Sequence, residues 1–394
     1  MINIKNKSEC CGCGCCEAIC VSQAIHMEKD QNGFLYPVVK KEKCINCGLC
    51  DNHCPVLNHK NEEELNHKAF AAYAKNAQTR FNGSSGGMFG LLAEYVLSKS
   101  GVVYGAGFDQ ELKLKCMPAK TVDELIPLYK SKYLQSDLNK VFPKIQEHLE
   151  NGKTVLFVST PCQVFALKLF LKKEYSNLIL VDFVCHGVPS QDFFDRCKLF
   201  VENKDNIKIL DYQFRSKIKN GATPHYYKIK YVKNNKIKEK TSLYLNSPFY
   251  YGFQKYITLR DSCYDCRFAT TNRVSDITIS DFHNIDKYIS KINRFDGVST
   301  VVTNTKKGLE IWHKISENCD AYEMDFKELY HNKEMMCGST KKPPSRDDFI
   351  KDLETMPFDY VVKKHLNGKK EIFKKVYYSL PSFVRKRFKR LLGL

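Results

Sequence analysis

The sequence predicts three parts: a small cysteine-rich head, an α/β domain with a mixed sheet, and a basic helical tail. Three observations predict this organisation. Six of the eighteen cysteines lie within residues 10–20, strand-like and helix-like apolar segments alternate from about residue 69, and basic residues dominate the C-terminal end. A chain of 394 residues is expected to form two or three domains. We place the boundaries at 1–60 for the head, 61–150 and 151–349 for the two parts of the α/β domain, and 350–394 for the tail.

The head contains one duplicated cysteine motif. The spacing C-x2-C-x2-C-x3-C occurs at Cys10, Cys13, Cys16 and Cys20, and again at Cys44, Cys47, Cys50 and Cys54. In two-cluster ferredoxins, three such cysteines wrap one [4Fe-4S] cubane while the fourth reaches the other cluster. The predicted ligand sets are therefore Cys10, Cys13, Cys16 with Cys54, and Cys44, Cys47, Cys50 with Cys20. Cys11 and Cys15 fall outside the spacing, and Val21 stands where a proline normally follows the motif.

Zinc and disulfides are the alternative explanations of these cysteines. Structural zinc sites usually take cysteines in pairs, whereas these come as triplets with a trailing fourth. The first ten residues contain no apolar signal region, and no run of about 18 apolar residues occurs, so a soluble, cytoplasmic protein is expected. Thiols stay reduced in that compartment, which disfavours a disulfide framework.

The net charge of +18 does not require a nucleic-acid partner. Residues 363–394 contain eleven Lys and Arg against the single acid Glu371, a local charge of +10, which leaves +8 for the rest. Each four-thiolate cluster adds about −2 when oxidised and offsets part of that excess. A basic nucleic-acid-binding protein folded around zinc is the remaining alternative, and it predicts colourless preparations.

Residues 69–349 alternate between predicted strands and helices. Strands are expected at 70–74, 101–108, 154–160, 177–185, 276–280 and 299–305, and helices at 86–100, 138–152, 162–173 and 306–319. This alternation favours an α/β layer with a largely parallel central sheet. Short segments between about 207 and 245, such as 225–232, predict an antiparallel section, which makes the sheet structure mixed. The polar run 58–68 is interpreted as a linker.

Four scattered cysteines form a second candidate site. Cys162 and Cys185 each follow a predicted strand, and Cys263 and Cys266 form a C-x2-C pair. Ligands bind at the carboxyl ends of parallel strands, so the first two should lie on the functional edge of the sheet. Together the four supply the thiolates of a third [4Fe-4S] cluster. The alternative is that they are packing residues, as we interpret Cys116, Cys197, Cys319 and Cys337.

The glycine- and serine-rich segment at 82–87 predicts a phosphate site. Its residues precede a predicted helix and offer N–H groups, hydroxyls and a helix dipole: Asn82, Gly83, Ser84, Ser85, Gly86 and Gly87. A flexible loop with a helix N-cap is the alternative. The GAG at 105–107 lacks the third glycine of a dinucleotide fingerprint, so direct reduction by NAD(P)H is less favoured.

The order of the motifs resembles the coenzyme F420 hydrogenase/dehydrogenase beta-subunit family. The resemblance extends from the head to PPSRDDF, near residue 349, and includes NGSSGGMF (82–89), SKYLQSD (131–137), STPCQV (159–164), VDFVCHGVPS (181–190), FRSK (214–217), SCYDCRFA (262–269) and RVSDITISDF (273–282). It implies FAD and iron–sulfur clusters as cofactors. Members with a two-cluster head and a basic tail look most like a bacterial group found with surface-polysaccharide genes, so the F420 of the name does not identify the substrate.

The resemblance also implies further flavin-binding residues. They are Ser131, Lys132, Tyr133, Gln135, Ser136, Thr160, Gln163, His186, Gly187 and Arg215. A helix end with solvated polar residues is the alternative for 131–136. From its chemistry and position beside Cys185, His186 is a candidate proton donor to reduced flavin or substrate. Asp281 and His283 are weaker candidates for the same pocket, since loop histidines and strand-end carboxylates are usually structural.

The predicted function is that of an iron–sulfur flavoprotein oxidoreductase. Electrons from a low-potential carrier such as ferredoxin would enter at the head, pass the third cluster and collect on FAD, which then reduces an organic substrate. Clusters carry single electrons, whereas a flavin accepts one and delivers two. The competing hypothesis is a non-catalytic electron-transfer subunit that serves a partner enzyme. The substrate, the direction of transfer and association with a second copy of the chain stay open.

The last fourteen residues predict an amphipathic helix that starts at Pro381 and Ser382. Val384, Phe388, Leu391 and Leu392 lie on one face, and Arg385, Lys386, Lys389 and Arg390 lie largely around the other. Such a helix can lie on an anionic bilayer, here the inner face of the cell membrane. A solvated tail or a helix that docks on a partner is the alternative.

Overall fold

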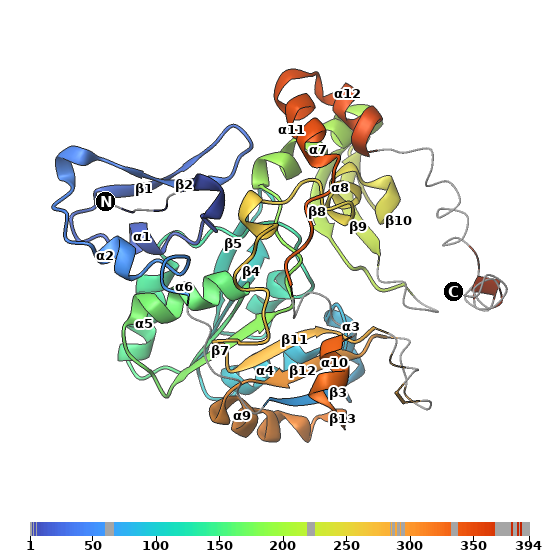
Figure 1. The fold of residues 1–394 in the computed structure, drawn as a ribbon. Helices are drawn as coiled ribbons and strands as arrows, with labels where there is room; N and C mark the ends of the chain where they lie inside the picture. Colours follow the sequence, from blue (N-terminus) through green and yellow to red (C-terminus); the bar gives the residue numbers. More distant parts are fainter. Residues whose placement is uncertain are drawn as a thin grey trace.

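The computed structural model shows a head, an α/β body and a smaller lobe (Figure 1). It describes all residues except 1, 3, 5, 60–66, 219–224, 284, 286–287, 290–291, 293–295, 332–337, 367–379, 381–383, 386 and 388–394. The predicted amphipathic helix from Pro381 therefore lies almost wholly outside the described residues, as do Cys337 and most of the predicted linker. Within the described part of the chain, no helix combines the length and the apolar character needed to cross a membrane.

The two cysteine motifs of the head fold in the same way. The 3-10 turn η1 (Lys7–Glu9) and helix α1 (Cys15–Ala18) recur 34 residues later as η2 (Lys41–Lys43) and α2 (Leu49–Asn52). Gly14 and Gly48 precede the two helices with φ of 72° and 74°. Between the repeats, β1 (Ile25–Lys29) pairs antiparallel with β2 (Leu35–Val39). The duplicated spacing thus corresponds to a duplicated backbone.

The body is built on one eight-stranded mixed sheet. Its strands, in the order β13-β3-β12-β11-β7-β6-β4-β5, are β3 (Lys68–Ala74), β4 (Val102–Phe108), β5 (Leu114–Ala119), β6 (Val155–Ser159), β7 (Leu178–Phe183), β11 (Ile277–Asp281), β12 (Ser299–Thr303) and β13 (Cys319–Met324). Parallel pairing is confined to the centre of the sheet, where β4 pairs with β6, β6 with β7, and β7 with β11. The pairs on either side of this centre are antiparallel. The mixed sheet of the predicted fold class is confirmed. The narrower expectation of a largely parallel sheet holds only for the central strands, because connections such as the short turn from β4 to β5 reverse the chain.

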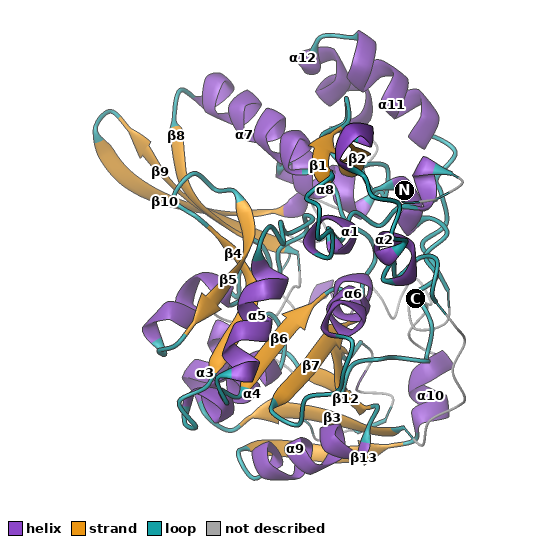
Figure 2. Cartoon of the chain, turned by 90° about the vertical axis from the view of Figure 1, so that its left-hand side faces the viewer, coloured by secondary structure: helices purple, strands orange, loops and turns teal. Residues whose placement is uncertain are grey.

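Helices cover both faces of this sheet (Figure 2). The body helices are α3 (Ala77–Asn82), α4 (Met88–Leu97), α5 (Val141–Glu150), α6 (Pro161–Leu171), α9 (Lys306–Ser316) and α10 (Phe326–His331). In β6, Val155 and Phe157 pack toward α5 and α6, whereas Leu156 packs toward α4 and α9. A strand buried on both faces must be apolar throughout, which is why its sequence shows a continuous run rather than alternation.

The smaller lobe contains the predicted antiparallel section. Its three-stranded sheet has the order β10-β9-β8, with β8 (Lys208–Gln213), β9 (Tyr226–Lys233) and β10 (Lys236–Leu243). The sheet packs with α7 (Gln191–Asp205), α8 (Pro248–Gln254), α11 (Arg346–Thr355) and α12 (Phe358–Val361). Short turns of helix complete the chain: η3 (Asp123–Leu128), η4 (Tyr244–Asn246), η5 (Asp261–Cys263) and a π-type turn, η8 (Val362–Leu366). Nearly half of the buried residues in the core of the lobe are Phe or Tyr.

The head packs on α6 of the body. Cys15 is fully buried, and its thiol donates a hydrogen bond to the carbonyl of Ala166 in α6, with a sulfur–oxygen distance of 3.5 Å. Cys11 and Cys13 belong to the same apolar core as α6. Cys15 is therefore a packing residue at this contact, which places the first cysteine motif against the carboxyl-terminal edge of the parallel strands.

Candidate functional site

Five thiols line a cavity of about 250 Å³ between the head and the body, which we call the thiol cavity. They are Cys11, Cys162, Cys185, Cys263 and Cys266. Cys162 lies in the first turn of α6, directly after β6, and Cys185 follows β7. Cys263 ends η5, and Cys266 lies in the turn that follows. The fold thus brings the four scattered cysteines together at the strand ends, and it adds Cys11 from the head.

The thiol cavity also contains a buried arginine. Arg273 is only 3% exposed, and its three guanidinium nitrogens have no hydrogen-bond partner among the described residues. Its only ion pair there is with the Asp182 carboxylate, at 3.6 Å. A buried guanidinium without hydrogen bonds is costly, so an acceptor or an anion in the cavity would stabilise it. Soft sulfur donors and a cation together match an anionic iron–sulfur cluster.

The thiols of this cavity are protonated near neutral pH. Burial raises the pKa of Cys185 to about 12 and that of Cys266 to about 11. For Cys162, a hydrogen bond with Cys11 is the main cause of a raised pKa. Metal binding needs thiolates and therefore releases protons. Within the described ranges, no three His, Cys, Asp or Glu side chains converge closely enough to hold a single ion.

The two predicted ligand sets of the head differ in their surroundings. Cys10, Cys13, Cys16 and Cys54 line one small cavity of about 20 Å³, together with Cys11. This volume is too small for a cubane unless the four thiols turn outward. In the second set, Cys20 and Cys50 pack around one small core, Cys44 is half-buried and Cys47 is exposed. The structure brings the first set together around one cavity, whereas the second set ranges from the buried Cys50 to the exposed Cys47.

A larger cavity of about 520 Å³ lies at the carboxyl ends of the parallel strands and is here called the large cavity. Most of the predicted flavin-binding residues line it: Ser84, Ser85, Gly87, Ser131, Lys132, Tyr133, Ser136, Thr160, Gln163, His186, Gly187 and Arg215. Asn82, Gly83, Gly86 and Gln135 do not. A Cβ on Gly86 would lie 2.4 Å from the Ala72 carbonyl oxygen, so this glycine permits packing on β3. The volume is in the range of small-molecule and cofactor sites.

The serine-rich loop is fixed against its neighbours and ends in a helix. Ser85 donates a hydrogen bond to the Val298 carbonyl at 2.6 Å, and the Ser131 amide donates to Ser84 Oγ at 2.7 Å. Gly87 then starts α4 with a φ of 89°. Since Gly87 and Met88 line the large cavity, the N-terminus of α4 faces it. A helix N-terminus favours bound anions, so this end of the cavity suits a phosphate.

Cations concentrate around the same loop. Lys130, Lys132 and Arg215 line the large cavity, and Lys217 donates a hydrogen bond to the Ser85 carbonyl at 2.8 Å. Burial, together with neighbouring cations, lowers the pKa of Lys130 to about 8 and that of Lys217 to about 7. Burial also lowers the pKa of Lys132 to about 7. Crowded, buried cations favour an anionic guest. Sequence reasoning missed Lys130 and Lys217, which lie outside any phosphate-binding motif.

The candidate catalytic residues are partly engaged in structural contacts. The His186 ring lies 6.2 Å from the Tyr256 ring in a stacked arrangement and lines the large cavity. Asp281 forms an ion pair with Arg215 at 2.5 Å, and His283 also lines the large cavity. Gln163 accepts hydrogen bonds from Ser136 and Thr160 and donates one to the Ser136 carbonyl. Gln163 therefore braces the cavity wall.

The three cavities form a row. Cys11 lines both the small head cavity and the thiol cavity. Cys185 and Gly187 line both the thiol cavity and the large cavity. The head cysteines, the body cysteines and the cation-rich pocket are thus adjacent in that order.

Comparison with known proteins supplies one family match. The model of the family that comprises the carboxy-terminal part of coenzyme F420 hydrogenase/dehydrogenase beta subunits matches residues 152–328. Among solved structures, the chain is similar to one in the F420-reducing [NiFe] hydrogenase complex from Methanosarcina barkeri, with a TM-score of 0.43 and 16% identity over 81% of this chain and 96% of that chain. No curated protein matches the chain.

Proposed function

We propose that the protein is an iron–sulfur flavoprotein oxidoreductase, since residues 152–328 match the family of coenzyme F420 hydrogenase/dehydrogenase beta subunits. In this proposal, single electrons from a low-potential carrier such as ferredoxin enter at the head. They pass to the thiol cavity and then to FAD in the large cavity, where an organic substrate is reduced. The link to surface-polysaccharide synthesis rests on the sequence resemblance.

The row of adjoining cavities is the observation that carries this proposal. A redox chain needs its centres close together and in order, and shared lining residues place one cavity directly against the next. Cys162, Cys185, Cys263 and Cys266 would hold the third cluster, with Arg273 opposite its negative charge. The Ser84–Ser85 loop, Lys130 and Lys132 would hold a flavin phosphate.

The cofactors supply the redox chemistry: clusters transfer single electrons, and a flavin pairs them for hydride transfer. The residues of this chain bind and orient the cofactors and exclude water from the cavities. Arg215 and Asp281 brace each other in the wall of the large cavity. His186 lies on the wall that the large cavity shares with the thiol cavity, next to Cys185, and we propose it as the proton donor.

Anaerobic purification with iron, sulfide and flavin quantification tests the proposal. We expect about twelve irons per chain, and one flavin, because three cubanes hold four irons each. The visible spectrum should show a broad shoulder near roughly 400 nm, characteristic of thiolate-bound iron–sulfur clusters, with flavin bands superimposed. A pale protein that contains zinc and no iron would contradict the proposal.

An electron-transfer subunit without its own substrate is the second candidate. The family name favours it, because a beta subunit is one component of a larger enzyme. In that case the clusters and the flavin are present, but the isolated chain turns over no small molecule and passes its electrons to a partner enzyme. Steady-state turnover by the isolated chain separates the two.

Flavin binding should weaken as the pH rises from 7 to 9. Lys132, Lys217 and Lys130 have pKa values of about 7, 7 and 8, so the cationic forms that attract phosphate are lost across this range. The acid that faces Lys132 is Asp211. Its charge raises the pKa of Lys132 but does not offset the larger effect of burial. Loss of one required protonated group weakens binding by about tenfold per pH unit above its pKa.

Fluorescence titration of flavin-depleted protein with FAD at several pH values measures this effect. Lys132→Arg is the matched control, because arginine keeps its charge throughout the range. In this variant the FAD affinity should decrease less steeply with rising pH. An affinity of the unmodified protein that is constant between pH 7 and 9 would show that the lysines do not bind the flavin phosphate.

A further inference from the structure

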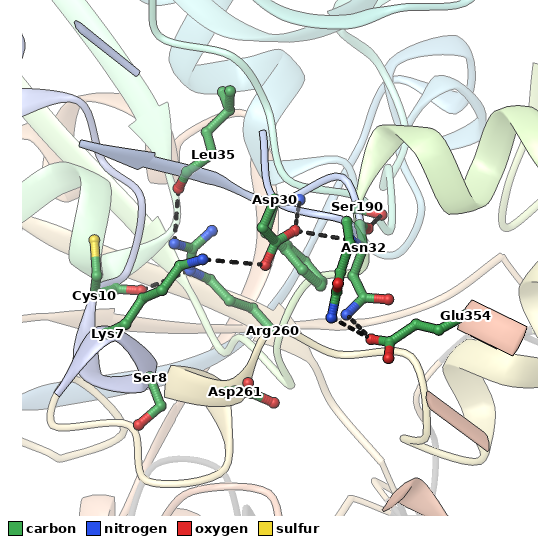
Figure 3. Close-up of polar contacts among 12 residues, drawn as sticks. Lys7, Ser8, Cys10, Asp30, Asn32, Leu35, Ser190, Arg260, Asp261 and Glu354 are labelled. Carbon is green, nitrogen blue, oxygen red and sulfur yellow. Dashed lines mark hydrogen bonds and ion pairs between the residues drawn. The ribbon is translucent and has the colours of Figure 1, made fainter. Parts of the chain in front are cut away.

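Arg260 is a fully buried arginine that joins the body to the head (Figure 3). It lies three residues before Cys263, in the segment that supplies two thiols to the thiol cavity. Its Nε donates a hydrogen bond to the Cys10 carbonyl at 2.6 Å, and one terminal nitrogen donates to the Leu35 carbonyl at 2.8 Å. The guanidinium also lies over the Tyr36 ring, 4.2 Å from its centroid. One body side chain therefore holds both the first cysteine turn and strand β2.

Gln135 completes this contact. Its Nε2 donates hydrogen bonds to the Cys11 carbonyl at 2.9 Å and the Gly12 carbonyl at 3.1 Å, and its Oε1 accepts one from Arg260 at 3.1 Å. Its backbone amide donates to the Pro189 carbonyl at 3.0 Å, which fixes it to the body. Arg260 and Gln135 thus bind three consecutive carbonyls of the first cysteine turn, and we call this pair the clamp.

Gly12 shows how closely the clamp fits. Its φ is +64°, and a Cβ at this position would lie 2.7 Å from an Arg260 nitrogen and 2.8 Å from Gln135 Nε2. The equivalent position in the second motif, 34 residues later, is Asn46, which has a φ of 51° and is exposed. The duplicated turns therefore share a backbone conformation, but among the described residues only the first turn receives hydrogen bonds from body side chains.

The clamp holds the backbone that carries the Cys11 side chain. Cys11 is 8% exposed, lines the thiol cavity together with Cys162, and also lines the small head cavity. Cys15, which also falls outside the ligand spacing, instead packs on α6. We propose that Arg260 and Gln135 are positioning residues that hold Cys11 against Cys162, so that single electrons cross from head to body at this junction. The electron-transfer part rests on the proposed function; the positioning part does not.

Other contacts keep the head attached when the clamp is removed. Lys29 pairs with Asp192 at 2.7 Å, and Ser190 donates to the Asn32 carbonyl at 2.6 Å. Gln31 donates to Glu354 at 2.8 Å at the far end of the hairpin. Loss of Arg260 should therefore loosen the first cysteine turn without releasing the head. Gln31→Ala is the matched control, since it removes a head–body hydrogen bond away from Cys11.

The experiment compares Arg260→Met, Gln135→Leu and Gln31→Ala with unmodified protein, all purified anaerobically. The first measurement is the rate at which N-ethylmaleimide alkylates Cys11, located by peptide mass spectrometry. The second is iron per chain. The third is stopped-flow bleaching of the flavin by a reduced ferredoxin, a donor too large to enter the large cavity.

We expect the two clamp variants to keep their iron. Their Cys11 should be alkylated about tenfold faster and their flavin bleached about tenfold more slowly, because each variant loses buried hydrogen bonds that hold the turn. Gln31→Ala should match the unmodified protein. If Arg260→Met loses iron, Gln135→Leu decides, since it removes the contacts to Cys11 and Gly12 and the hydrogen bond from Arg260 but leaves the Arg260 bonds to Cys10 and Leu35 in place. Unchanged labelling and bleaching in Gln135→Leu would overturn the inference. If the protein contains no clusters, the labelling still tests the clamp, and only the electron route fails.

Discussion

Replacing Cys263 with serine should lower the iron content by about four atoms per chain and leave the head clusters intact. Cys263 lines the thiol cavity with Cys162, Cys185 and Cys266, and it is the thiol that the loop after Arg260 brings to this site. A serine hydroxyl is a poor ligand for the iron of a cluster, which selects soft thiolates. None of the eight predicted head ligands lines the thiol cavity, so we expect the head clusters not to depend on this residue.

Iron and sulfide quantification of anaerobic preparations measures the effect, and Cys197→Ser is the matched control. Cys197 is 2% exposed and packs in the core of the lobe, away from the thiol cavity. Its replacement should leave the iron unchanged and destabilise the fold by about 1–3 kcal/mol, as expected for a buried hydroxyl without a partner. Unchanged iron in Cys263→Ser would refute a third cluster at these cysteines.

The body elements were predictable because their burial follows from the sequence pattern. The run predicted at 154–160 has four consecutive apolar residues at 155–158, and β6 is buried from end to end between two helical layers. The edge strands β5 and β13 were missed, because β5 contains Pro118 and β13 is largely half-exposed or exposed. Such sequences carry neither the apolar run of a buried strand nor a clear alternation.

The order of the strands could not be predicted. Strand β3 lies between β12 and β13, although more than 200 residues separate it from both in the chain. Pairing at such separations depends on how complete layers pack, and no local pattern encodes it.

At the candidate site, the sequence indicated which cysteines would meet but not what holds them. Cys162 and Cys185 follow adjacent parallel strands, and that position alone predicts that they meet at one edge. Arg260 and Arg273 have no motif spacing that distinguishes them from surface arginines. The resemblance assigns Gln135 to the flavin, yet its side chain binds the head. The glycine at position 12, which has no counterpart in the second motif, was the available signal for a close contact.

Removing the positive charge of Arg273 should lower the midpoint potential of the body cluster. The guanidinium is buried in the thiol cavity without hydrogen-bond partners among the described residues, and its charge opposes the raised pKa values of Cys185 and Cys266. A nearby cation stabilises the reduced cluster, which carries one more negative charge than the oxidised form. Hydrogen bonds to charged groups contribute about 1.5–3 kcal/mol. Losing that much stabilisation of the reduced cluster lowers its one-electron midpoint potential by an amount on the order of 60–130 mV.

The variant must not leave a buried charge unpaired. Asp182 lies 3.6 Å from Arg273 and accepts a hydrogen bond from Thr278 at 2.6 Å, and burial raises its pKa. We therefore pair Arg273→Gln with Asp182→Asn, because removing one member of a buried pair is strongly destabilising. Asp182→Asn alone is the control, and Arg273→Lys keeps the charge while losing the planar fork.

Redox titration monitored by electron paramagnetic resonance measures the potential of the body cluster, after iron quantification has established that each variant is loaded. The double variant should titrate at a lower potential than Asp182→Asn alone, because these two proteins differ only in the charge of residue 273. Asp182→Asn should lie at or above the unmodified protein, since it removes a negative charge, and Arg273→Lys should lie close to the unmodified protein, since it keeps the positive charge. If the double variant keeps its full iron content and titrates at the same potential as Asp182→Asn, the guanidinium does not face the cluster. The buried nitrogens of Arg273 then require another partner, and the buried cation no longer supports a cluster at the cysteines of this cavity.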